Sequence, residues 1–144
     1  MSVIDREVIC GLIPHQGAMS LLDRVLRWDG TSIEALATSH RSATNPLRAH
    51  GELRAVHLCE YGAQAAAVHG GLLARAAGAT AAPGYLVSLR DVTFARRRID
   101  DLAGELAIRA ELLLQDSDSW QYRFAVGHED ATLASGRLAI IRRR

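Results

Sequence analysis

The stretch that decides the fold is RAVHLCEYGAQAAAVHGGLLARAA, residues 54–77. It is rich in alanine and leucine, contains no proline and has almost no β-branched residues, so it predicts one long helix. The glycine pair at 70 and 71 is where this helix is expected to bend or to end its first section. The alanines at 63 and 65–67 leave a thin, smooth surface, which a sheet can wrap closely.

Strand patterns fill most of the remaining sequence. A short helix is expected over residues 2–12, ended by Pro14, and Asp29-Gly30 is a hairpin turn signal. Alternating or β-rich composition predicts strands at 19–28, 32–40, 84–98, 104–114, 120–127 and 131–143. The order is helix, two strands, long helix, four strands. It indicates an α+β fold in which an antiparallel sheet of about six strands wraps around one helix, as a single domain over 1–144.

Length, charge and composition exclude several classes of protein. The chain has 144 residues, 49% of them hydrophobic, which suits one domain with one core. The net charge of +1 names no partner, and the aromatic residues are too few and scattered for a nucleic-acid surface. No apolar run reaches the ~20 residues of a membrane helix, and no secretory leader opens the chain. Cys10 and Cys59 make no disulfide framework, so a cytoplasmic location is expected.

Glu60 is the residue of the long helix whose chemistry stands out. Its neighbours are mostly apolar, and at ~100° per residue Gln64 falls on the same face. A carboxylate on a helix wrapped by a sheet is costly to bury without a partner, and burial would raise its pKa toward that of a general acid or base near neutral pH. Two interpretations follow: a catalytic group, or a residue on a solvent-exposed edge of the helix.

Histidine is the natural partner for such a carboxylate, because its pKa lies near working pH. His15 precedes the first strand, His50 lies in the loop before the long helix, and His57 lies on the helix itself. For each of them a surface or capping role is the commoner alternative.

The remaining candidate groups have simpler explanations. His69 is nine residues from Glu60 and faces the opposite side of the helix, whereas His40 and His128 look like strand-end or turn residues. Cys59 adjoins apolar positions, which favours a buried structural thiol over a nucleophile. No histidine pair has metal-ligand spacing, and nucleotide-binding and serine-hydrolase motifs are absent, so we expect no metal and no cofactor.

Two motifs carry a resemblance to a known family. LIPHQGAMSLLDRV (12–25) resembles the N-terminal signature of 3-hydroxyacyl-[acyl carrier protein] dehydratases, in which Pro-His is followed by an apolar run that ends in Asp-Arg-Val. LCEYGAQAAAVHG (58–70) resembles the central helix of that family, in which a glutamate precedes Ala-Gln. In this sequence those residues are Glu60, Ala63 and Gln64.

Two further stretches, NPLRAHGELRA (45–55) and GYLVSLRDV (84–92), look closest to the small dehydratases of aryl polyene and related pigment pathways. The resemblance covers essentially the whole chain and implies the hotdog fold, a long helix wrapped by an antiparallel sheet. It also implies a reaction: a 3-hydroxyacyl thioester on acyl carrier protein loses water to give the trans-2-enoyl thioester, in fatty-acid-like or aryl polyene pigment biosynthesis.

The resemblance implies roles for individual residues. A histidine takes the C2 proton, Glu60 protonates the departing hydroxyl, and Gln64 holds Glu60 or that hydroxyl. Where the family carries its catalytic histidine in a Gly-His-Phe-Pro loop, this sequence has Pro46. The base is therefore His15, whose PHQGAM segment stands intact, or His50 in a reshaped loop. We favour His15.

The start of the long helix is the expected binding place of the thioester carbonyl. Where the family has Pro-Gly, this sequence has Arg54 and Ala55. The backbone amides of Ala55, Val56 and His57 are the candidates, because a helix N-terminus favours developing negative charge.

The resemblance implies partners as well. Acyl carrier protein is acidic, so the arginine runs at 96–98 and 142–144 would attract it if they lie near the mouth of the acyl tunnel. A homodimer or a heterodimer with a related hotdog subunit is expected, and the long strand at 84–98 is consistent with edge pairing. Two alternative functions stay open: an acyl thioesterase on the same fold, or a non-catalytic acyl-binding partner subunit.

Overall fold

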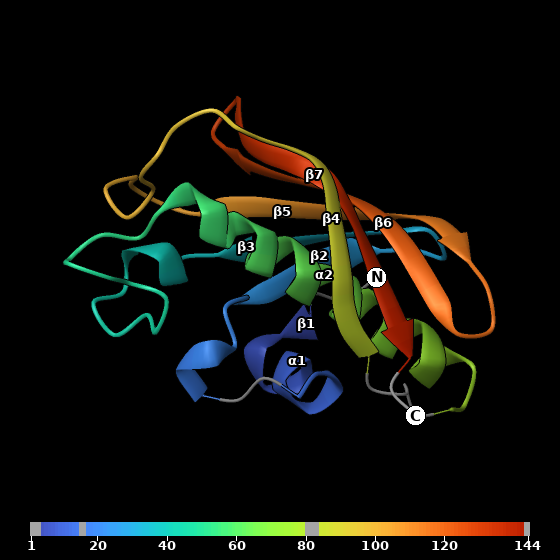
Figure 1. Ribbon diagram of the computed structural model, residues 1–144. Coiled ribbons are helices and arrows are strands. Elements are labelled where there is room, and N and C mark those ends of the chain that lie inside the picture. The colour runs from blue at the N-terminus through green and yellow to red at the C-terminus, as the bar shows by residue number, and fades with distance from the viewer. Residues whose placement is uncertain (1–3, 15–16, 80–83, 143–144) are drawn as a thin grey trace.

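One antiparallel sheet of seven strands dominates the computed structural model, which describes residues 4–14, 17–79 and 84–142. The strands are β1 (Ile4–Asp5), β2 (Arg24–Trp28), β3 (Ser32–Ala37), β4 (Gly84–Phe94), β5 (Leu106–Gln115), β6 (Ser119–His128) and β7 (Ala131–Arg142). They lie in the order β1-β2-β3-β5-β6-β7-β4. The helices are α1 (Arg6–Leu12) and α2 (Leu58–Ala76), with short 3₁₀ turns η1 (Gly17–Met19), η2 (Ser39–Arg41) and η3 (Ala55–His57). Figure 1 shows the sheet curving around α2, so the expected α+β hotdog arrangement is confirmed.

The seventh strand is the short β1, which lies within the region expected to be helical. Ile4 and Asp5 pair with β2 at the edge of the sheet. The Asp5 carboxylate then accepts a hydrogen bond from the Val8 amide at 3.1 Å and caps α1. The first helix is therefore shorter than the helix expected over residues 2–12.

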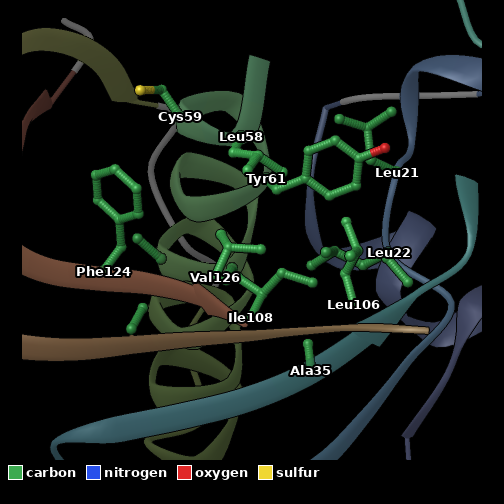
Figure 2. Packing of buried hydrophobic residues seen from close by; sticks show 14 of the residues in the cluster. Leu21, Leu22, Ala35, Leu58, Cys59, Tyr61, Leu106, Ile108, Phe124 and Val126 are labelled. Atoms are coloured by element: carbon green, nitrogen blue, oxygen red, sulfur yellow. The ribbon is translucent and has the colours of Figure 1, made fainter. Parts of the chain in front are cut away.

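Helix α2 fills the inside of the curved sheet and packs against β3, β5, β6 and β7. Its buried side carries Tyr61, Ala65 and Val68, each 0% exposed. Gly62 permits a close approach to the sheet, because a Cβ at this position would lie 2.7 Å from the Phe124 ring. Figure 2 shows side chains of this core (Leu58, Tyr61, Leu106, Ile108, Phe124, Val126).

The paired glycines do not divide α2 into two sections, which was one of the two alternatives expected for them. The helix continues to Ala76. Gly71 packs against α1, where an added Cβ would lie 3.1 Å from the Leu12 Cβ. A Cβ at Gly70 would meet no described atom within 4 Å, so this side of the helix is open.

Three strands are shorter than expected. The strand expected over 32–40 ends at Ala37, before the turn η2, and the other two lose an end whose backbone bonds elsewhere. The strand expected from residue 19 begins at Arg24, since the backbone of Met19 and Leu21 bonds to a side chain of α2. The strand expected over 84–98 stops at Phe94, and Arg98 forms an isolated antiparallel bridge with Arg54 instead. No helix in the described part of the chain is long and apolar enough to cross a membrane.

Candidate functional site

Gln64 joins α2 to the segment that precedes β2. Its side chain is fully buried, and its Nε2 donates to the Met19 carbonyl at 2.7 Å and to Glu60 Oε1 at 3.2 Å. Its Oε1 accepts from the Leu21 amide at 2.9 Å. Only one orientation of the amide satisfies both the carbonyl and the N–H, so these contacts fix the side chain. Gln64 therefore holds residues 19–21 against the face of α2 that carries Glu60.

Glu60 is half-buried in the first turn of α2, where the helix dipole favours a carboxylate. The hydrogen bond from Gln64 orients it. The residues that follow on the same face are small: Ala63 and Ala67 are half-buried, and Gly70 faces open space. A narrow strip without bulky side chains therefore runs from Glu60 along the helix.

A buried hydroxyl network holds the other end of the Leu21 peptide. Ser39 Oγ donates to the Leu21 carbonyl at 2.7 Å and lies 2.8 Å from Tyr61 Oη. Asn45 Nδ2 donates to the Ser39 carbonyl at 2.9 Å and to Tyr61 Oη at 3.3 Å. Burial raises the pKa of Tyr61, so its hydroxyl stays protonated. Figure 2 shows Tyr61 directed toward Leu21.

Sequence reasoning missed this network. A tyrosine on the buried face of a helix needs a hydrogen-bond partner for its hydroxyl. That requirement was the available signal. Asn45, before a proline, was assigned only to a loop. Because Ser39 and Gln64 bind the two sides of Leu21, the network supports the position of Glu60 without contacting it directly.

At the start of α2, the Val56 amide has no acceptor among the described residues. The Ala55 amide donates to the Arg97 carbonyl at 2.7 Å, and the His57 amide donates to the Arg54 carbonyl at 3.1 Å. No described residue accepts a hydrogen bond from the Val56 amide, and Val56 is 53% exposed. Val56, Glu60 and Gln64 follow at four-residue intervals, so they lie on roughly one side of the helix.

Three histidines were candidates for the base or the substrate site, and the other three were not. His15 lies outside the described residues. His50 is exposed with φ 53°, in a tight turn whose ends, Ala49 and Glu52, bond to each other. His57 is half-buried at the start of α2.

The other histidines are bound into the scaffold. His69 lies 2.8 Å from Tyr122 Oη and 2.8 Å from the Asp29 carbonyl, and burial lowers its pKa, so the ring is neutral. It packs against β6 inside the sheet, which fits the expectation that it does not share the face of Glu60. His40 and His128 lie 2.9 Å and 2.6 Å from carbonyls of one turn, residues 102 and 103.

Cys59 is buried, and burial raises the pKa of its thiol, so it is a structural residue as expected. A cavity of about 500 Å³ with a largely polar lining borders the segment that Gln64 binds, at Ala18 and Ser20. Its lining includes Arg6, Asp23 and Arg41 but not Glu60. These walls do not suit an acyl chain.

The arginine run at 96–98 is neutralised by neighbouring carboxylates. Arg96 pairs with Asp101 at 3.0 Å, Arg97 with Glu52 at 3.0 Å, and Arg98 with Asp100 at 2.8 Å. The run is therefore not a patch of net positive charge. The second run is described only as far as Arg142, whose guanidinium lies 5.7 Å from the Trp120 ring centroid.

Strand β4 forms an exposed edge of the sheet, since β7 is its only strand neighbour within the described residues. Apolar side chains on both of its faces are exposed: Tyr85, Leu86, Val87 and Leu89 are 54%, 41%, 51% and 43% exposed. An exposed apolar edge strand invites pairing with another chain.

Comparison with known proteins gives both a family and a set of similar folds. The family model described as ApeP dehydratase matches residues 8–144. The dehydratase heterocomplex ApeI:P from Xenorhabdus doucetiae contains a similar chain: the TM-score is 0.85 at 23% identity, covering 94% of this chain and 91% of that chain. No curated protein sequence matches this chain.

More distant structures share the fold alone. The PaaI protein of the E. coli phenylacetic acid degradation operon has a TM-score of 0.60 at 16% identity, covering 87% of this chain and 85% of that chain. A hypothetical thioesterase with coenzyme A from Streptococcus pneumoniae has a TM-score of 0.59 at 10% identity, covering 83% and 84%.

Proposed function

Because this chain belongs to the ApeP-like family of dehydratases, we propose that it removes water from a 3-hydroxyacyl thioester carried on acyl carrier protein and leaves the trans-2-enoyl thioester. The dehydratase activity and the aryl polyene branch, both expected from the sequence, are confirmed by the family match. The carrier protein and the residue roles are what we add.

The observation that carries the residue assignment is the pair of contacts made by Gln64. Its Nε2 reaches Glu60 at 3.2 Å and the Met19 carbonyl at 2.7 Å. The acid on the helix and the segment just after His15 are thus bound to one amide. Met19 is the fourth residue after His15, so their Cα atoms are at most ~14 Å apart. This proximity in the chain supports His15 over His50, which lies on an exposed turn.

The chemistry then divides among three groups. The His15 imidazole takes the proton from C2, and Glu60 gives a proton to the departing C3 hydroxyl. The Val56 amide donates to the thioester oxygen, where negative charge develops as the C2 proton leaves. The strip at Ala63, Ala67 and Gly70 gives the acyl chain a path along α2.

We propose that the partner subunit is a related hotdog chain that pairs along β4. The exposed apolar edge of β4 supports this pairing, and the similar chain from Xenorhabdus doucetiae belongs to a heterocomplex. Arg54 is exposed beside Val56, so it offers a positive charge to an acidic carrier protein at the start of α2. Cys10 and Cys59 form no disulfide, which suits the reducing cytoplasm that we assign to this protein.

The test is mass spectrometry of 3-hydroxyacyl carrier protein after incubation with the full chain, alone and with its related hotdog subunit. Loss of one water from the carrier-bound chain is the expected result. Release of free carrier protein would instead make the chain a thioesterase. An unchanged carrier-bound substrate, with the carrier retained on the protein, would make it a non-catalytic acyl-binding subunit.

A further inference from the structure

A single buried carboxylate, Asp100, ties the start of α2 to the segment that follows β4. Its side chain is only 5% exposed. Its Oδ1 accepts from the Leu53 amide at 2.9 Å and from Arg98 Nε at 2.9 Å, and its Oδ2 accepts from Arg98 Nη2 at 2.8 Å. The Arg98 contact is bidentate, the strongest arrangement of this ion pair.

The same carboxylate reaches the loop that leads to the helix. Arg48 Nη1 lies 3.8 Å from Asp100 Oδ2. The Arg48 guanidinium also donates to the carbonyls of Ser42 at 2.8 Å, Arg41 at 3.1 Å and Gly51 at 3.2 Å. Asp100 therefore joins three stretches: the loop at 41–51, the residues that begin the helix, and the return segment at 97–100.

Backbone bonds carry this arrangement forward to the open amide. The Ile99 amide donates to the Leu53 carbonyl at 3.0 Å, and the Ala55 amide donates to the Arg97 carbonyl at 2.7 Å. Residue 53 is thus hydrogen-bonded to residue 99 and residue 55 to residue 97. Val56 follows directly in the chain. Displacing the return segment would displace the Val56 amide with it.

A buried carboxylate costs stability unless donors surround it, and Asp100 has donors on both oxygens. The Arg98 guanidinium and the Leu53 amide hold the pKa of Asp100 well below its usual range. The neighbouring pair of Arg96 and Asp101 has the same chemistry, but both side chains are exposed, at 38% and 46%. The Arg98 side chain is 39% exposed, close to that of Arg96, so the two pairs offer a matched comparison of a buried and an exposed carboxylate.

We propose that Asp100 and Arg98 are positioning residues, which set the place of the Val56 amide, and so of the thioester carbonyl, relative to Glu60. This inference rests on the proposed function, because it needs the Val56 amide to bind that carbonyl. Neither residue touches the substrate. Their effect on the reaction passes through the backbone of residues 53–56.

The test compares Asp100→Asn, Arg98→Lys and the control Asp101→Asn in the full chain with its hotdog subunit. An amide at position 100 places an N–H donor against a donor of Arg98, so this variant shifts residues 97–100. We expect kcat to fall about ten-fold or more at nearly unchanged KM, because misplacement of a transition-state contact lowers kcat. Arg98→Lys keeps the charge but loses the bidentate contact, so its kcat should lie between those of the wild type and Asp100→Asn. Asp101→Asn should match the wild type.

A second measurement does not depend on activity. Amide hydrogen exchange over residues 53–58 should speed up in Asp100→Asn and stay unchanged in Asp101→Asn. Wild-type kcat in both Asp100→Asn and Arg98→Lys, measured below their melting temperatures, would overturn the inference while leaving the proposed function intact. Should Asp100→Asn not fold, Arg98→Lys and its exchange rates decide. A wild-type protein that dehydrates no carrier substrate would overturn both proposals.

Discussion

The two halves of α2 both bury polar side chains, but they use them differently. Near the C-terminal half, both ring nitrogens of His69 have partners, one on β6 and one on the β2–β3 turn, and the ring is fully buried. Near the N-terminal half, Gln64 is equally buried, yet its bonds leave Glu60 half-exposed beside an open Val56 amide. A fully buried polar group whose atoms all have partners, such as His69, stabilises the fold. A polar group that is oriented by a neighbour but half-exposed, such as Glu60, can still reach a substrate.

The sharpest way to break this comparison is to change Glu60. In Glu60→Gln the hydrogen bond from Gln64 can persist, but the acid is gone. Because general acid catalysis contributes about 10²- to 10⁴-fold, turnover should fall by at least that much. The melting temperature should stay within a few degrees of the wild type, since the side chain is only half-buried. Turnover of carrier-bound substrate and a thermal melt on the same preparation measure both, and full activity would refute the assignment.

The second prediction separates the candidate bases. His15→Gln should lower kcat about 100-fold or more, because the C2 proton loses its acceptor. His50→Gln serves as the matched control, since His50 is exposed on a turn, and its kcat should stay within about three-fold. Steady-state rates of the two variants decide between them. A large loss of kcat in His50→Gln with little loss in His15→Gln would identify His50 as the base. The segment bound by Gln64 would then not carry a catalytic residue.

The third prediction concerns the sealed half of the helix. His69→Leu leaves Tyr122 Oη and the Asp29 carbonyl without their buried partner, so the free energy of unfolding should drop by about 2 to 4 kcal/mol. Activity per folded molecule should be nearly unchanged below the melting temperature. Urea unfolding together with kcat measures this. A large loss of kcat with little loss of stability would place His69 in the catalytic machinery and erase the distinction between the two halves.

The smallest expected effect is on the pH dependence of stability. Burial lowers the pKa of His69 and of His40 below the ordinary value of 6.5. Below pH 6.5 the unfolded chain binds protons at these two histidines that the folded chain does not bind. The free energy of unfolding therefore keeps its full value above pH 6.5 and decreases as the pH falls below it. Urea midpoints should therefore be lower near pH 5.5 than near pH 7.5. The drop should shrink in His69→Leu, and equal midpoints at both pH values in the wild type would contradict the explanation.

Local patterns predicted most of the fold but little of what orients the site. The composition of residues 54–77 predicted α2, and alternation predicted the described strands other than β1 to within about five residues. The start of β2 was misplaced because Gln64, 45 residues from Met19 in sequence, takes a backbone carbonyl that a strand would use. Strand propensity describes local sequence only, so it does not predict a contact between residues so far apart.

The candidate site shows the same division. Glu60 and Gln64 were identifiable from their spacing on one helix, a local property. Tyr61 and Ser39 were not, because their hydroxyls meet across 22 residues of chain. The carboxylates that pair with the arginine run were also missed. Three consecutive arginines indicate a positive patch, and only the folded chain brings Glu52 beside Arg97 and Arg98.

The contacts of Gln64 with the segment before β2 go only to main-chain atoms, the carbonyl of residue 19 and the amide of residue 21. The side chain of Met19, 36% exposed, takes no part in them. At residue 19 the hold is therefore on the backbone alone, whereas the side chains of Ser20 and Leu21 are buried. Position 19 is therefore one where the side chain can be varied while Gln64 keeps its hold on both the main chain and Glu60.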